Sequence, residues 1–223
     1  MGHTIFQGDK VIEQEKEIIN TIRTISGARS PYEVFADWVH MVAVSISNSS
    51  DIIRTKTTEI REEEYMNISK RYQPEQLLDL CRINALLVEC FEDEINDYLG
   101  EIYMALDIGN RDTGQFFTPF HLSYMAAKLS TPHDDVINMI EPSCGGGGMV
   151  IAAAKVIQDR GMNYQKVLRV NAKDLDFKAV YMSYIQFSLL GINGVVEQGD
   201  ALNGKPVGLI NKFFTPAWKG VLI

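Results

Sequence analysis

The chain has 223 residues, of which 46% are apolar, and its formal net charge is −8. This length and apolar content suffice for a buried core, and the acidic balance argues against a protein that coats nucleic acid by neutralising phosphates with Lys and Arg. No apolar run approaches the ~20 residues of a membrane span and no signal-peptide core opens the chain, so we expect a cytoplasmic protein.

The charge is divided unevenly along the chain. Residues 1–110 contain 10 Lys and Arg against 20 Asp and Glu, whereas residues 111–223 contain 11 against 9. Such a shift in composition favours two units of different kind. We therefore predict an N-terminal domain over residues 1–110 and a second domain over residues 111–223.

The first domain is predicted to be all-helical, with four to five helices. Ser30 and Pro31 form a typical N-cap and first-turn pair ahead of a helix over residues 31–49. Asp51 is the expected cap of the next helical segment, residues 52–72. Pro74 opens a longer helical region over residues 74–106, with Leu77, Leu80, Leu87 and Phe91 as its apolar stripe.

The second domain alternates helical and strand patterns. A short helix over residues 119–129 precedes an apolar run that Pro142 ends and that we interpret as a buried strand, residues 136–142. Further along the chain we expect a helix closed by Gly161, a strand, a helix ending at Gly191 and a strand, over residues 149–161, 166–176, 177–192 and 194–200. This order predicts an α/β, Rossmann-like parallel sheet.

The turn after the first strand has the sequence EPSCGGGG, residues 141–148. In a Rossmann-like sheet the first strand-to-helix turn is the usual ligand cradle. No Lys and no Ser or Thr follows the glycines, so a phosphate-binding loop of the NTPase kind is disfavoured. Glu141 favours a positively charged ligand group, and the following helix N-terminus favours a carboxylate. The turn therefore predicts a ligand with an α-amino acid moiety.

Two further acids follow later strands. Asp174 ends the second strand, where a carboxylate can accept both hydroxyls of a ribose. Asp200 ends the third strand, where it can accept a proton from the amino group of adenine. Each acid alone is more often a helix cap or a solvated charge. Together they indicate S-adenosylmethionine.

Four ordered segments resemble the N6-adenine DNA methylases, especially the modification subunits of type I restriction systems. They are GQFFTPFHLSYMAAKL, EPSCGGGGMVIAAAKV, AKDLDFKAVYMSYIQFSLLGI and QGDAL, between residues 114 and 202. The resemblance implies an S-adenosylmethionine-dependent methyltransferase fold, methyl transfer to the N6 atom of adenine, and DNA as a partner. It also implies association with other subunits of a restriction-modification system or with further copies of the chain.

The same resemblance assigns the cofactor contacts. It places five residues of one segment over the methionine part of S-adenosylmethionine: Gln115, Phe116, Phe117, Thr118 and Pro119. The amino and carboxylate groups are assigned to the turn, with Glu141, Pro142, Gly145, Gly146, Gly147 and Gly148. Asp174 is assigned to the ribose and Asp200 to the adenine.

One family motif is missing. These enzymes hold a flipped adenine with an Asn/Asp-Pro-Pro-Tyr/Phe loop, and the 223 residues contain no such sequence. The nearest segment, residues 215–218, ends in Trp218, which either stacks on a base or packs in the fold. Only one further strand is expected, such as residues 219–223, so the sheet is shortened and no catalytic residue is assigned. A catalytically inactive binding or assembly module is the alternative function, and methylation of a protein or RNA is a weaker one.

Other chemical readings are less favoured. Cys144 has no neighbouring His and is interpreted as a small packing residue, and the spacing of Cys and His residues does not indicate a metal site. The tetrapeptide Phe-Phe-Thr-Pro occurs at 116–119 and again at 213–216, which we interpret as chance. Four basic residues form a candidate rim for DNA, although scattered surface charges are the common case: Arg160, Lys166, Arg169 and Lys173.

Overall fold

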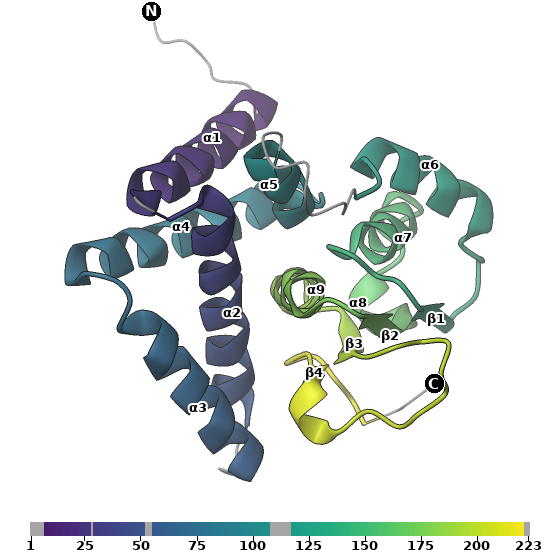
Figure 1. Cartoon of the computed structure of the whole chain (residues 1–223). Helices are drawn as coiled ribbons and strands as arrows, with labels where there is room; N and C mark the ends of the chain where they lie inside the picture. Colours follow the sequence, from purple (N-terminus) through teal and green to yellow (C-terminus); the bar gives the residue numbers. More distant parts are fainter. Residues whose placement is uncertain (1–6, 28, 52–54, 108–116, 221–223) are drawn as a thin grey trace, which may run out of the picture.

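The first half of the chain is helical. The computed structural model describes residues 7–27, 29–51, 55–107 and 117–220. Its first half contains α1 (Gln7–Ser26), α2 (Pro31–Ser50), α3 (Lys56–Ser69), α4 (Pro74–Asp93) and α5 (Tyr98–Asp107), as Figure 1 shows. The predicted helical character and number of helices are confirmed. The expected domain boundary at residue 110 lies outside the described residues.

The starts of α2 and α3 follow from local capping chemistry. The backbone N–H of Glu33 donates to the Ser30 hydroxyl, and the Glu33 carboxylate accepts the N–H of Ser30 at 2.8 Å, so the predicted cap of α2 is confirmed. The prediction that Asp51 caps the next helix was wrong, because Thr55 is the N-cap of α3. Asp51 instead follows α2, and its carboxylate accepts the Thr58 hydroxyl at 3.1 Å.

In its described residues, the second half contains a four-stranded sheet. Its elements are α6 (Phe120–Ser130), β1 (Ile137–Glu141), α7 (Gly148–Asp159), α8 (Tyr164–Val167), β2 (Leu168–Asp174), α9 (Phe177–Leu189), β3 (Asn193–Gln198), a 3-10 turn η1 (Leu209–Asn211) and β4 (Lys212–Phe214). The strands lie in the order β1-β2-β3-β4, the first three parallel and β4 antiparallel to β3. The Rossmann-like parallel part is confirmed. The last described strand is β4 at residues 212–214; of the strand predicted over residues 219–223, residues 219 and 220 are not in a strand and the rest lie outside the described residues.

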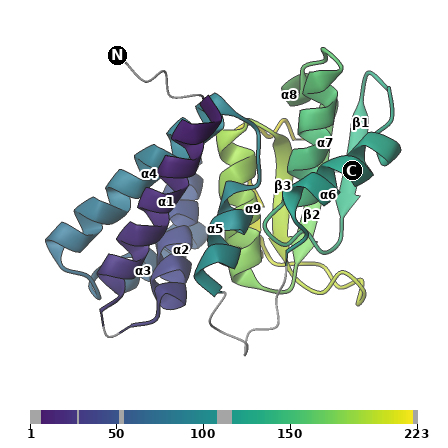
Figure 2. The same ribbon diagram turned by 90° about the horizontal axis from the view of Figure 1, so that it is seen from above.

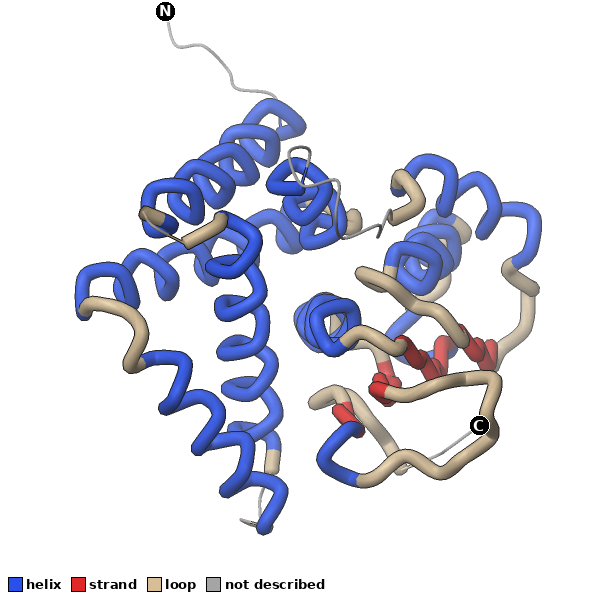
Figure 3. The backbone as a smooth tube through the Cα atoms, in the orientation of Figure 1, coloured by secondary structure: helices blue, strands red, loops and turns tan. Residues whose placement is uncertain are grey.

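One face of the sheet is covered by helices. Figure 3 shows α6, α7 and α9 on one side of the strands, with loops and η1 on the other. Strand β2 reflects this asymmetry, since Leu168, Val170 and Ala172 are buried while the residues between them are only half-buried. The expectation of a buried first strand was wrong: β1 is an edge strand, and Ile140 on it is 65% exposed.

The helical half and the sheet share one apolar core. Helix α9 lies between α2 and the sheet in both ribbon views (Figures 1 and 2). Val180 and Phe187 of α9 are fully buried in the same cluster as Phe35 of α2 and Ile151 of α7. Within the described residues, no helix is both long and apolar enough to span a membrane.

A buried arginine joins α3 to β4. Arg61 is 4% exposed; its guanidinium donates to the Ser47 hydroxyl at 2.6 Å and to the Lys212 carbonyl at 2.7 Å. The same group lies 4.1 Å from the centre of the Phe213 ring, a cation–π contact. Burial lowers the pKa of Arg61. The side chain therefore satisfies carbonyl groups at the end of η1 and attaches β4 to the helices.

Replacing this arginine is expected to destabilise the fold. Arg61→Met leaves the Ser47 hydroxyl and the Lys212 carbonyl without their donor, and should lower the free energy of unfolding by about 2 kcal/mol or more. Urea titration measures the loss. Arg82→Met, at an exposed position of α4, is the matched control and should change stability by less than about 0.5 kcal/mol. Equal losses in the two variants would contradict the role of Arg61.

A second prediction concerns pH. Burial raises the pKa of Glu15 on α1 to about 8, and repulsion from Glu101 on α5 adds to the shift. Because the folded-state pKa lies above the unfolded one, this group's contribution to stability falls as the pH rises from about 4.5 through about 8. Glu15→Gln should therefore raise the melting temperature more at pH 9 than at pH 6, by roughly 2–4 °C per kcal/mol of relieved repulsion.

Thermal unfolding at the two pH values measures this effect. Glu17→Gln removes a charge from an exposed position of the same helix and serves as the control. A gain for Glu15→Gln that is equal at pH 6 and pH 9 would show that ionisation of this carboxyl does not affect stability.

Candidate functional site

The glycine-rich turn connects β1 to α7, as predicted. The N–H of Gly145 donates to the Asp174 carboxylate at 2.9 Å, and the N–H of Cys144 donates to the Lys173 carbonyl at 2.9 Å. The other oxygen of Asp174 accepts the N–H of Asp176 at 3.0 Å. The turn is therefore attached to the carboxyl end of β2, and Asp174 orders it.

Close packing explains why the turn needs glycines. A Cβ atom at Gly145 would lie 2.9 Å from the Phe117 ring, and one at Gly147 would lie 2.7 Å from the Phe187 ring. Gly147 also has φ of +99°, a left-handed conformation that side chains disfavour. At Gly148 a Cβ would lie 2.8 Å from Oδ2 of Asp97. Neighbouring side chains thus approach the backbone where a larger residue would exclude them.

A hollow of about 310 Å³ lies against this turn. Six of the predicted site residues border it: Phe117, Thr118, Gly145, Gly146, Gly148 and Asp174. A second hollow of about 260 Å³ shares Phe117 and Thr118 with the first and is also bordered by Pro119. The structure therefore brings the segment after residue 116, the glycine turn and the acid of β2 to one place.

The other predicted residues take different positions. Four of them are not among the described residues that line the first hollow: Glu141, Pro142, Gly147 and Asp200. The Glu141 carboxylate accepts the N–H of Ser143 at 3.2 Å, and burial raises its pKa. Asp200 lies in the loop after β3 and accepts the N–H of Leu202 at 2.8 Å. Gln115 and Phe116 lie outside the described residues.

Asp97 is a site residue that the sequence analysis missed. It precedes α5, is 3% exposed and borders both hollows. Its Oδ1 atom accepts the N–H of Gly100 at 3.0 Å and the side-chain amide of Gln186 at 2.7 Å. Burial raises its pKa, while these two hydrogen bonds act in the opposite direction. An Asp before a helix is a common N-cap signal, so the local sequence indicates a cap and nothing more.

Gln186 of α9 connects Asp97 to the glycine turn. Its side-chain N–H groups donate to Asp97 and, at 2.7 Å, to the Gly146 backbone carbonyl. Its side-chain oxygen accepts the N–H of Leu99 at 3.1 Å. Gln186 is fully buried. The start of α5 and the glycine turn are therefore held by the same side chain.

Cys144 and His40 both serve packing. Burial raises the pKa of the Cys144 thiol to about 12, which keeps it protonated and supports its interpretation as a packing residue. His40 stacks on Tyr181 at 4.5 Å and contacts the Glu64 carboxylate at 3.2 Å. Among the described residues, no three His, Cys, Asp or Glu side chains gather as metal ligands would.

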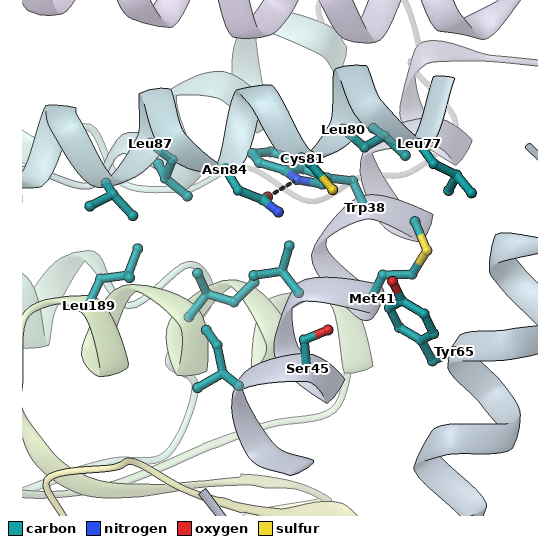
Figure 4. A pocket seen from close by; sticks show the side chains of 14 residues that line it. Trp38, Met41, Ser45, Tyr65, Leu77, Leu80, Cys81, Asn84, Leu87 and Leu189 are labelled. Atoms are coloured by element: carbon teal, nitrogen blue, oxygen red, sulfur yellow. Dashed lines mark hydrogen bonds between the residues drawn. The ribbon is translucent and has the colours of Figure 1, made fainter. Parts of the chain in front are cut away.

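An apolar hollow of about 280 Å³ lies elsewhere, between α2, α3, α4 and α9. Figure 4 shows Trp38 in it, with its indole N–H donating to the side-chain amide oxygen of Asn84 at 2.5 Å. The described lining is mostly aliphatic and aromatic and has no charged side chain. None of the predicted site residues borders it, so the candidate site remains at the glycine turn.

The hollow at the turn combines two kinds of charge recognition. Helix α7 starts at Gly148 with Gly147 as N-cap and no side-chain cap, so N–H groups of its first turn are available to an anion. The Asp97 and Asp174 carboxylates border the same hollow and favour a cation or hydroxyl groups. The arrangement can bind a ligand that carries both an anionic and a cationic group.

Comparison with known families agrees with this geometry. The sequence model of the family described as N-6 DNA Methylase matches residues 94–213, more than half of the chain. The chain belongs to the N-6 DNA methylase family. The matched residues include α5 and Asp97, which lie before the expected boundary at residue 110. The division into two domains at that residue stays a prediction.

A solved structure shows the same fold as this chain. A crystal structure described as that of a class I S-adenosylmethionine-dependent methyltransferase from Listeria monocytogenes has a TM-score of 0.53 and 14% sequence identity. The likeness covers 87% of this chain and 57% of that one, so this chain spans little more than half the length of that protein. No curated protein sequence matches the chain significantly.

The second Phe-Phe-Thr-Pro of the chain has a structural role. Phe213 is buried in β4, and the Thr215 hydroxyl donates to the Ile192 carbonyl at 2.7 Å and accepts the N–H of Gly194 at 3.1 Å. Trp218 packs on Phe214, with ring centres 4.3 Å apart. The second tetrapeptide therefore attaches β4 to β3, and Trp218 contributes to packing.

Substitution of the turn should separate packing from backbone strain. Gly147→Ala is expected to cost about 1–2 kcal/mol for its left-handed conformation and a further ~1–3 kcal/mol for the clash with Phe187. Gly161→Ala is the matched control, because Gly161 has φ of +76° with no atom within 4 Å of a Cβ. Urea unfolding compares the two variants, and equal losses would contradict the packing role of Gly147.

Proposed function

We propose that this chain binds S-adenosylmethionine in the hollow beside the glycine turn. The observation that carries the proposal is the meeting of an uncapped helix N-terminus with the Asp174 carboxylate and the Phe117–Thr118 segment at one hollow. The cofactor's carboxylate lies at the start of α7, and its ribose hydroxyls donate to Asp174. Phe117, Thr118 and Pro119 cover the methionine part, and Asp200 lies toward the adenine.

The proposed reaction is methyl transfer to the N6 amino group of adenine in DNA. The nitrogen lone pair attacks the methyl carbon of the sulfonium, the carbon–sulfur bond breaks, and S-adenosylhomocysteine and a proton leave. These 223 residues contain no Asn-Pro-Pro or Asp-Pro-Pro sequence to hold the flipped base. We therefore assign no catalytic residue within these 223 residues, and propose that the chain is related to the modification subunits of type I restriction systems.

The same absence favours a second candidate, a binding or assembly module without activity of its own. Such a module keeps the cofactor hollow and loses the capture of adenine. Both candidates share binding of S-adenosylmethionine, and they differ in whether the methyl group reaches DNA.

DNA is the proposed macromolecular partner, and the cytoplasm the proposed location. Two of the four basic residues expected to face DNA are engaged within the fold. Arg160 donates to the Thr131 carbonyl at 3.0 Å, and Lys173 pairs with Glu197 at 3.3 Å. Lys166 and Arg169 have no such partner among the described residues, so they are the stronger candidates for phosphate contacts.

Calorimetric titration with S-adenosylmethionine tests the shared premise. The wild-type chain should bind, and Asp174→Asn should bind at least about tenfold more weakly, because a hydrogen bond to a charged acceptor contributes about 1.5–3 kcal/mol. Asp135→Asn, at an exposed position before β1, removes the same charge and should bind like wild type. Absence of binding by the wild-type chain would overturn the proposed function.

Transfer of labelled methyl groups separates the two candidates. The chain is incubated with labelled S-adenosylmethionine and adenine-containing duplex DNA, with adenine-free duplex as the control. Label in the first duplex alone supports the enzyme. Cofactor binding without label in either duplex supports the module.

A further inference from the structure

Two polar side chains from outside the glycine turn border the same hollow as that turn. Asp97 precedes α5, and Ser123 lies on α6. Ser123 is 1% exposed, and its hydroxyl has no hydrogen-bond partner among the described residues. A buried hydroxyl without a partner is uncommon in folded proteins, because its desolvation is then uncompensated. The hydroxyl thus points to a ligand group that the hollow receives.

Both side chains flank the start of α7. A Cβ at Gly148 would lie 2.8 Å from Oδ2 of Asp97 and 3.6 Å from the Ser123 hydroxyl oxygen. Asp97 is fixed through its other oxygen, since Oδ1 accepts from Gln186 and from Gly100. The carboxylate is therefore held in place by the protein, with Oδ2 beside the first residue of the helix.

Within the fold, an ionised Asp97 has no charge partner. Among the described residues, no Lys, Arg or His forms an ion pair with it. A buried carboxylate without a cation is costly, and its raised pKa reflects that cost. A ligand with a cationic group at Oδ2 would supply the missing charge.

The position of an α-amino acid in the hollow then follows. The N–H groups at the start of α7 suit its carboxylate, and the ammonium group, one carbon away, falls on the side of Asp97 and Ser123. Glu141, the acid expected to hold the ammonium, does not border the described hollow and accepts a hydrogen bond from Ser143 within the turn.

We infer that Asp97 and Ser123 form the subsite for the ammonium group of S-adenosylmethionine, in place of Glu141. This inference rests on the proposed function, since it requires the cofactor in this hollow. It assigns half of the amino-acid recognition to the residue before α5 and to α6, outside the glycine turn.

Asp97→Asn is the primary test. The amide oxygen can still accept from Gln186 and Gly100, but the charge is lost and an NH₂ group takes the place of Oδ2. Calorimetry compares S-adenosylmethionine with 5′-methylthioadenosine, which keeps the adenine, ribose and sulfur but lacks the amino acid. We expect at least a tenfold loss of affinity for the first and no change for the second. Parallel loss of both affinities, or no loss, would overturn the inference.

Ser123→Ala provides a second test that is independent of the hydrogen bonds around Asp97. Removing a hydroxyl without a partner should preserve the fold, as circular dichroism can verify. The affinity for S-adenosylmethionine should fall about 2- to 10-fold, and the affinity for 5′-methylthioadenosine should not change. Ser130→Ala, elsewhere on α6, is the control. If Asp97→Asn does not fold, unchanged affinity of Ser123→Ala overturns the inference. Failure of the wild-type chain to bind either ligand instead overturns the proposed function.

Discussion

The side-chain amide of Gln186 holds together three segments that are distant in the sequence. Its N–H groups reach Asp97 and the Gly146 carbonyl, both at 2.7 Å, and its carbonyl accepts from Leu99. All these groups are away from water, where an unmet hydrogen bond costs more than at the surface. These hydrogen bonds connect the start of α5 to the glycine turn, and the hollow lies against both.

The glycines of the turn leave room for the side chains that pack on it. Two aromatic rings, from Phe117 and Phe187, and the Asp97 carboxylate each occupy space that a side chain on the turn would fill. The glycines therefore admit the neighbours that form the hollow. A turn of this kind is selected by its surroundings as much as by the ligand, which explains why it does not follow the spacing of a phosphate-binding loop.

Much of the fold could be predicted from the sequence, because helices and strands here follow local rules. Ser30 begins a helix and Gly161 follows the end of one, both where expected. The strand–helix alternation predicts three parallel strands. The errors are tertiary in origin. Ile140 is exposed because its strand lies at the edge of the sheet, which periodicity cannot show. Asp97 has the local signature of a helix cap, and only the folding of α5 against the glycine turn places it in the hollow.

The position of α5 has a consequence for how this fold can be divided or exchanged between relatives. The boundary suggested by composition, residue 110, separates Gly146 from the acid that lies beside it. A chimera joined at that residue would inherit the turn from one parent and Asp97 from the other. The chimera would form the same site only if Gln186 from one parent still donated to Asp97 from the other. The segment that forms this hollow begins before α5. A junction placed before Asp97 is therefore expected to be tolerated best.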